Sequence, residues 1–131
     1  MALHVQLVSP ERTVYEGEAT LVVARTSDGE IGFQAGHVPF VGTLLPSVVR
    51  LSLAEGGEQR IAVHSGFIEI ADDHLTLLCD VAELAENIDT ARARDALARA
   101  EAAMAADAGD VEATAAMRRA KARLRAVGAD A

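Results

Sequence analysis

A change in composition near residues 83–89 divides this chain into two parts that favour different secondary structure. All three prolines and eight of the ten glycines precede it, among short runs of valine, isoleucine and leucine. After it, 19 of the 47 residues from Ala85 to Ala131 are alanine, and the only glycines are Gly109 and Gly128. Glycine, proline and β-branched residues disfavour helix, whereas alanine is the strongest helix former. We therefore predict a β-rich domain over residues 1–84 and a helical domain over residues 85–131.

The first part contains many short apolar segments that are typical of strands. Leu3, Val5 and Leu7 alternate with polar residues, which is the period of a half-buried strand. Another strand is expected to begin at Thr13–Tyr15. The further strand candidates are Leu21–Arg25, Ser47–Leu53, Gln59–His64, Phe67–Ile70 and Leu75–Cys79. Turn residues separate them, as at Ser27-Asp28-Gly29, Gly56-Gly57 and Asp72-Asp73. Strands at roughly ten-residue spacing favour an antiparallel sandwich or barrel.

Two helices are predicted in the second part. Asn87 or Asp89 offers an N-cap for a helix that runs to about Ala106, and Asp110 offers an N-cap for the next one. The inward faces are predicted to be Ala93, Leu97, Ala100 and Met104 on the first helix, and Ala113, Met117, Ala120, Leu124 and Val127 on the second. These stripes are narrow and rich in alanine, so they predict an antiparallel hairpin with a weak seam that can open.

The formal net charge of −8 belongs to the first part alone. Residues 1–84 hold 12 acidic residues and four arginines, whereas residues 85–131 hold eight acidic and eight basic residues. An acidic body argues against nucleic acid or anionic lipid as the main partner, and it indicates either a solvated surface or a docking face for a basic partner. No apolar run approaches the roughly 20 residues of a membrane span, and the N-terminus does not resemble a signal peptide. We expect no direct membrane insertion.

The sequence contains no familiar catalytic or metal-binding set. The glycines after Asp28 are not followed by the Gly-Lys-Ser/Thr of a phosphate-binding loop, and the four histidines lack metal-ligand spacing. His64-Ser65 with Asp80 lacks a nucleophile-elbow pattern, so a small hydrolase remains a rival interpretation only. The single cysteine, Cys79, is expected to be a core residue. We therefore expect no catalytic residues, no metal and no required cofactor.

Glycine is dense in the segment from Ser27 to Phe40, which allows tight backbone conformations and predicts that Glu30 and His37 lie on loops. The segment contains Gly29-Glu30-Ile31-Gly32 and Gly36-His37-Val38-Pro39-Phe40, and Ser65-Gly66-Phe67-Ile68 follows later. In this order, and continuing through Ala82-Glu83 into the tail, these motifs resemble the epsilon subunit of bacterial F-type ATP synthases. Ala35 and Ser65 stand where that family often has proline and glycine.

The resemblance implies an α+β, mainly β, fold: an antiparallel β-sandwich of about ten strands followed by an α-helical hairpin. It implies a non-catalytic subunit of the central stalk, which links gamma to the c-ring for proton-driven ATP synthesis. It also implies a peripheral location at the cytoplasmic face of the cell membrane. Glu30 corresponds to a position that meets the c-ring, and His37 to one that faces gamma. The opened tail would reach the beta subunit and restrain ATP hydrolysis.

The resemblance also implies a regulatory ATP site in the tail. The motif is Ile88-Asp89-Thr90-Ala91-Arg92-Ala93, with Arg119 and Arg123 on the second helix and Glu83 before it. Glu83 and Asp89 would accept from adenine or ribose, Ile88 would cover the base, and the three arginines would meet the phosphates. The alternative is that Asp89 is only an N-cap and that the basic residues offset the helix dipole. A stand-alone ATP-binding sensor is the alternative function.

Overall fold

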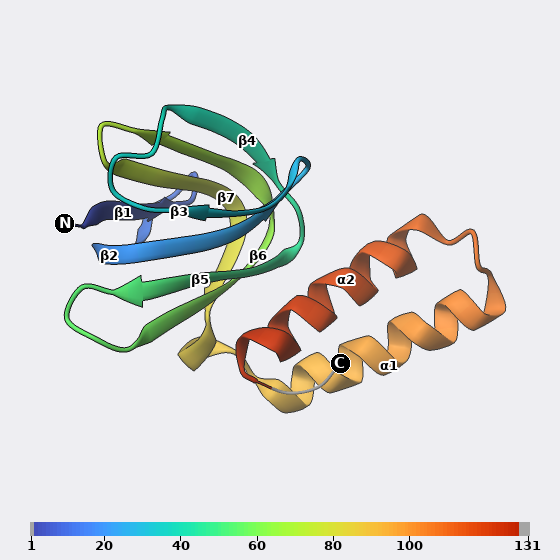
Figure 1. Ribbon diagram of the computed structural model, residues 1–131. Coiled ribbons are helices and arrows are strands. Elements are labelled where there is room, and N and C mark those ends of the chain that lie inside the picture. Colours follow the sequence, from blue (N-terminus) through green and yellow to red (C-terminus); the bar gives the residue numbers. More distant parts are fainter. Residues whose placement is uncertain (1, 129–131) are drawn as a thin grey trace.

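The computed structural model describes residues 2–128 and places a β-sandwich beside a pair of antiparallel helices (Figure 1). The strands are β1 (Leu3–Val8), β2 (Thr13–Thr26), β3 (Gly29–Phe33), β4 (Phe40–Leu44), β5 (Ser47–Leu53), β6 (Glu58–Ala71) and β7 (His74–Leu84). A short 3-10 turn, η1 (Ala85–Asn87), leads into the helices α1 (Thr90–Ala106) and α2 (Val111–Ala126). The predicted class, a mainly β fold with a C-terminal helical hairpin, is confirmed.

The described chain has seven strands rather than about ten, because two of them are long enough to pair with several neighbouring strands. β2 is 14 residues long; it pairs with β1 through its first half and with β3 and β5 through its second half. β6 is also 14 residues long and pairs first with β5 and then with β4. The segments Gln59–His64 and Phe67–Ile70, which we predicted as separate strands, are therefore parts of one strand.

Strand pairing closes the sheet on itself. β1 pairs with β2, β2 with β5, β5 with β6, β6 with β7, and β7 returns to β1. The β1–β7 pair is parallel, which corrects the prediction of an entirely antiparallel sandwich. This pair forms because β1 is inserted between β2 and β7, the second and the last strand of the chain. A closed ring of strands leaves few unpaired edges and favours a stiff body.

The core lies inside this ring and is almost entirely aliphatic. Leu3, Val5 and Leu7 are fully buried, so the predicted alternation of β1 is confirmed. Cys79 is 3% exposed, as expected of a core residue, and burial together with the charge of Asp80 raises the pKa of its thiol to about 11. The largest other core side chains are Phe33, Leu44, Leu51, Ile61, Ile68, Ile70, Leu75 and Leu77.

β6 bends at Ser65 and Gly66, where its register with β7 shifts. Gly66 has φ of 154°, and a Cβ at this position would lie 2.1 Å from the backbone oxygen of Leu78. Only glycine fits this close approach of two backbones. The bend lies where the neighbour of β6 changes from β5 to β4.

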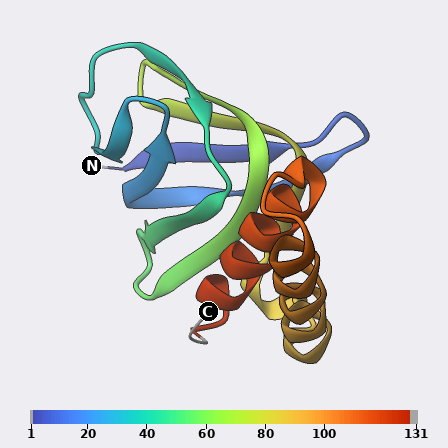
Figure 2. The same cartoon turned by 90° about the vertical axis from the view of Figure 1, so that its right-hand side faces the viewer.

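The helical hairpin lies along one side of the sandwich, with α2 between the sheet and α1 (Figures 1 and 2). α2 contacts β5 and β6, and α1 contacts α2. The predicted seam residues Ala93, Ala100 and Ala120 are buried. Ala122 and Ala126 are also buried, although neither belongs to the predicted stripe. α2 therefore buries more than the one face that the sequence pattern predicted.

Candidate functional site

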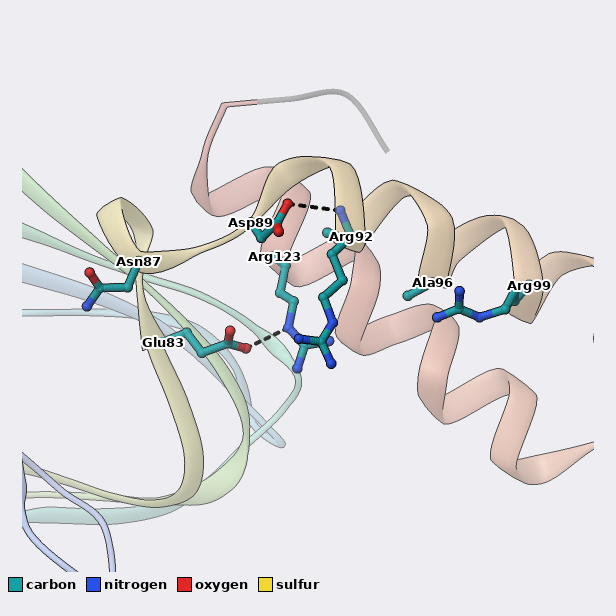
Figure 3. Close-up of a pocket in the computed structure, with 8 residues that line it drawn as sticks. Glu83, Asn87, Asp89, Arg92, Ala96, Arg99 and Arg123 are labelled. Carbon is teal, nitrogen blue, oxygen red and sulfur yellow. Dashed lines mark hydrogen bonds and ion pairs between the residues drawn. The ribbon is translucent and has the colours of Figure 1, made fainter.

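A cavity of about 380 Å³ opens where the end of β7, the start of α1 and the second half of α2 meet (Figure 3). Its polar walls come from all three segments, and we refer to it as the hairpin pocket. Two alanines of α1 form the apolar part of the wall. The lining residues are Glu83, Asn87, Asp89, Arg92, Ala93, Ala96, Arg99 and Arg123.

Glu83 connects the sandwich to α2 across the floor of this pocket. Its Oε1 accepts a hydrogen bond from Arg123 Nε at 2.5 Å, and His64 Nε2 lies 3.0 Å from the same oxygen. Burial alone would raise the pKa of Glu83, but the hydrogen bonds from Arg123 and His64 more than offset it and hold that pKa below 4.5. Glu83 is therefore ionised at neutral pH.

His64 lies behind Glu83 on β6 and is 6% exposed. Burial lowers its pKa below 6.5, against the opposing effect of the Glu83 carboxylate, and the charges of Arg123 and Arg119 lower it further. The neutral imidazole donates from Nε2 to Glu83, while its buried Nδ1 has no hydrogen-bond partner among residues 2–128. In this part of the chain His64 makes no hydrogen bond to Ser65 or Asp80, so the geometry gives no support to a hydrolase.

Asp89 caps α1, because its carboxylate accepts from the backbone N–H of Arg92 at 3.1 Å. The guanidinium groups of Arg92 and Arg123 point into the same space beside Glu83 (Figure 3). Two convergent arginines can hold an anion through forked hydrogen bonds, and here a carboxylate lies beside them. The pocket thus combines acceptors at one end with cationic donors in its middle.

The structure brings together four of the six residues proposed for ATP: Glu83, Asp89, Arg92 and Arg123. Ile88 does not line the hairpin pocket. Arg119 lines grooves on either side of α2 and forms an ion pair with Glu112 at 2.9 Å.

Sequence reasoning missed Asn87 and Arg99 among the polar lining residues. Arg99 follows Arg92 by seven residues, which places both on one helix face. The helical period could therefore have predicted that Arg99 lines the same pocket as Arg92.

Glu30 lies within β3, which corrects its predicted place on a loop. The two-residue turn at Ser27 and Asp28 is closed by Thr26, whose Oγ1 donates to the backbone oxygen of Gly29 at 2.9 Å, so strand pairing begins earlier than predicted. Glu30 forms ion pairs with Arg50 at 3.4 Å and Arg25 at 3.9 Å.

His37 does lie outside regular structure, between β3 and β4, as predicted. Its ring centroid is 4.9 Å from that of Phe33.

One outer face of the sandwich carries exposed apolar side chains. Phe67 on β6 is directly opposite Leu78 on β7, and the two residues are 55% and 47% exposed. Val41, on the neighbouring strand β4, is 67% exposed. These three residues define what we call the apolar face. A shallow cavity of about 590 Å³ lies over Phe67 and Leu78 and extends to Val8 and Pro10.

Comparison with known proteins accounts for both parts of the chain. Residues 2–85 match the family model for the beta-sandwich domain of the ATP synthase delta/epsilon chain, and residues 86–128 match the model for its long alpha-helix domain. The chain belongs to the ATP synthase delta/epsilon chain family. The resemblance inferred from the motifs is therefore confirmed.

Several relatives extend over most of this delta/epsilon-family chain. The ATP synthase epsilon chain of Streptomyces griseus is 51% identical over 125 residues, which cover 95% of this chain and 94% of that one. The ATP synthase epsilon chain of Thermobifida fusca is 49% identical and covers 98% of this chain and 93% of its own length. That of Legionella pneumophila is 41% identical, with coverage of 95% and 91%.

The fold recurs in a solved structure of a mitochondrial ATP synthase. A chain in the Euglena gracilis OSCP/F1/c-ring structure superposes with a TM-score of 0.82 at 22% identity, covering 95% of this chain and 80% of that one.

No helix within residues 2–128 is long and apolar enough to cross a membrane. The same residues contain no cluster of three or more His, Cys, Asp or Glu side chains suited to a metal ion.

Proposed function

We propose that this chain is the non-catalytic epsilon subunit of a bacterial ATP synthase, placed in the central stalk between gamma and the c-ring. The observation that carries the proposal is the 51% identity with an ATP synthase epsilon chain over 95% of this chain. The Euglena structure that shares the fold holds F1 and c-ring parts of such a complex. The stand-alone sensor gains no support, because both parts of the chain match one family.

The architecture suits a part that transmits torque. The closed ring of strands resists deformation, and the apolar face offers a site where a partner can bury Phe67, Leu78 and Val41. Exposed apolar side chains gathered on one face of an acidic protein are typical of a docking site. We assign this face to gamma. Glu30 and His37 are the residues we assign to contacts with the c-ring and gamma.

Co-purification with the rotor tests this placement. The full chain is expected to bind isolated gamma, and to bind the c-ring when gamma is present. In the cell, we propose that this complex lies at the cytoplasmic face of the cell membrane. Glu30→Arg is expected to reduce recovery of the c-ring without reducing recovery of gamma, because Glu30 is assigned to the c-ring contact and the apolar face is assigned to gamma. Recovery of neither partner by the wild-type chain would remove the proposal.

The hairpin pocket supports a second, regulatory role for ATP. We propose that the phosphates lie between Arg92 and Arg123, and that Glu83 and Asp89 accept hydrogen bonds from the nucleoside. Because these residues come from the sandwich, α1 and α2, a ligand that binds all of them stabilises the closed hairpin by mass action.

Equilibrium dialysis with magnesium-free ATP measures this binding directly. Arg92→Gln is expected to weaken it at least tenfold, because Arg92 lines the pocket. Arg94→Gln removes an equal charge from an exposed position outside the pocket and is expected to leave binding unchanged. Absence of binding to the wild-type chain at millimolar ATP would exclude the ATP site.

The open hairpin is the state that we propose restrains ATP hydrolysis, by reaching the beta subunit. Opening breaks the Glu83–Arg123 ion pair and exposes a basic helix, which carries five basic residues between Arg118 and Arg125. Deletion of residues from Asp89 onward is therefore expected to raise ATP hydrolysis by the assembled enzyme. Unchanged hydrolysis would remove the inhibitory role and leave the stalk role intact.

A further inference from the structure

Four arginines meet in a second cavity, of about 410 Å³, between the outer face of the sandwich and the last turn of α2. Arg25 comes from β2, Arg50 from β5, Arg60 from β6 and Arg125 from α2. Of the residues that the structure describes, Glu30 is the only acidic one in the lining of this cavity. The cavity shares no lining residue with the hairpin pocket. We refer to it as the arginine pocket.

The concentration of positive charge is unexpected for this body. Residues 1–84 contain 12 acidic residues and only four arginines, and three of those four line this one cavity. Arg50 and Arg60 are directly opposite each other in the β5–β6 register. Like charges at directly opposed positions destabilise a sheet. The arrangement therefore costs stability, and a bound anion would remove that cost.

The three sandwich arginines lie on the same face of the sheet. Arg50 is paired with Val23 on β2, and Arg25 follows Val23 by two residues, so its side chain leaves the same face. Neighbouring strands lie about 4.8 Å apart, so the row from β2 through β5 to β6 extends over about 10 Å. That length suits an anion with more than one phosphate group better than a single phosphate.

The carboxylates nearby do not neutralise the cluster. Glu30 lies 3.4 Å from Arg50 and 3.9 Å from Arg25, and Glu58 lies 2.5 Å from Arg60. All of these side chains are at least 42% exposed, where such pairs are weak and exchange readily. Arg125 has no ion-pair partner within the part of the chain that the structure describes. Among residues 2–128, four guanidinium groups against two carboxylates leave a net positive charge at the cavity.

We propose that the arginine pocket binds a phosphate-bearing anion, with adjacent phosphate groups held by the row of Arg25, Arg50 and Arg60 and by Arg125 from above. Guanidinium groups match phosphate through paired N–H donors and do not deprotonate at any physiological pH. Because Arg125 belongs to α2 and the others to the sandwich, the bound anion also fastens the last turn of α2 to the sheet. The proposal concerns the isolated chain and does not depend on its place in the stalk.

Titration calorimetry with inorganic pyrophosphate at constant ionic strength tests the site. Arg50→Gln and Arg125→Gln are each expected to weaken binding at least tenfold, and Glu30→Gln to strengthen it several-fold by removing a competing carboxylate. The matched control is Arg94→Gln, an equal loss of charge on the exposed side of α1, which is expected to bind as the wild type does. Inorganic phosphate in place of pyrophosphate is expected to bind more weakly.

The hairpin pocket also contains arginines, so the titration is repeated with Arg92→Gln. Binding that survives Arg92→Gln and is lost in Arg50→Gln supports the arginine pocket. Binding that is lost in Arg92→Gln and kept in Arg50→Gln overturns it, as does an equal loss in Arg94→Gln or no binding at millimolar pyrophosphate. Circular dichroism of each variant verifies that these exposed substitutions leave the fold unchanged.

Hydrogen exchange tests the fastening of α2 separately. Pyrophosphate is expected to slow exchange of the backbone amides in the last turn of α2 at least threefold in the wild type, and to have no such effect in Arg125→Gln. Equal slowing in both proteins would mean that the anion binds the sandwich alone, which would overturn the link to α2.

Discussion

Glu83 on β7 and Arg123 on α2 lie 40 positions apart in the chain, yet their side chains form an ion pair with 2.5 Å between Oε1 and Nε. Both side chains are less than one-third exposed, and His64 supports the carboxylate from the sandwich side. This pair is a direct polar connection between the rigid sandwich and the hairpin. Because this ion pair lies at the hairpin pocket, a ligand bound there would affect how readily the tail opens.

Arg123→Gln is expected to favour opening of the hairpin. A hydrogen bond to a charged group contributes about 1.5–3 kcal/mol, and its loss also leaves Glu83 partly buried with only His64 as a partner. Exchange of the α2 backbone amides through local opening is expected to accelerate roughly tenfold or more. Arg94→Gln removes the same charge from an exposed site and is the control. Equal exchange rates in Arg123→Gln and Arg94→Gln would show that the pair does not hold the hairpin.

Acidification is expected to open the hairpin in two stages. The pKa of His64 is lowered below 6.5, so the closed state binds fewer protons than the open state, and closure weakens as the pH falls below 6.5. The pKa of Glu83 is lowered below 4.5, so its contribution is complete above that value and is lost as the pH falls further. Amide exchange in α2, corrected for its intrinsic pH dependence, measures this effect between pH 7 and pH 4.

The matched variant for this pH series is His64→Gln, which keeps a polar side chain but does not titrate. It is expected to lose the stage below pH 6.5, which belongs to His64, and to keep the stage below pH 4.5, which belongs to Glu83. Global unfolding is a poorer measurement, because His4 contributes with the opposite sign. Hydrogen bonds with Glu18 and Glu16 raise the pKa of His4, so it adds stability below 6.5 that is lost as the pH rises. A wild-type exchange profile without any change from pH 7 to 5 would contradict the account of His64.

Gly66→Ala is expected to destabilise the sandwich by about 3 kcal/mol or more. The new methyl group would lie 2.1 Å from the backbone oxygen of Leu78, and neither strand can move without breaking the β6–β7 pairing. Gly32→Ala is the control, because its Cβ would meet only Leu21 Cδ1 at an ordinary 3.6 Å. Urea unfolding compares the two variants. A cost below about 1 kcal/mol for Gly66→Ala would contradict the close approach.

Local patterns predicted the strands that alternate and missed those that do not. The alternation of β1 and the turns at Gly56-Gly57 and Asp72-Asp73 are confirmed. β3 and β4 were not predicted, because each contains an interior glycine whose low strand propensity is overcome only by pairing with β2 and β6. The strand count was too high because single-sequence patterns cannot show that a long strand continues through a bend such as Gly66.

In the tail, too, local patterns predicted the secondary structure but not how the helices pack. The caps at Asp89 and Asp110 were readable from sequence and are confirmed. In helices so rich in alanine the apolar period is weak, so the burial of Ala122 and Ala126 was not predictable. The motif around Asp89 and Arg92 pointed to the hairpin pocket. The pairing of Glu83 with Arg123 depends on how the hairpin docks, which local patterns do not encode.

The most direct test of the stalk assignment is the affinity of the full chain for isolated gamma when the apolar face is altered. Phe67→Ser combined with Leu78→Ser removes two exposed apolar side chains from that face, and Val111→Ser removes one that is 81% exposed on α2. The double variant is expected to bind gamma at least tenfold more weakly, with an unchanged unfolding transition, and Val111→Ser is expected to bind like the wild type. Undiminished binding of gamma by the folded double variant would contradict the stalk assignment.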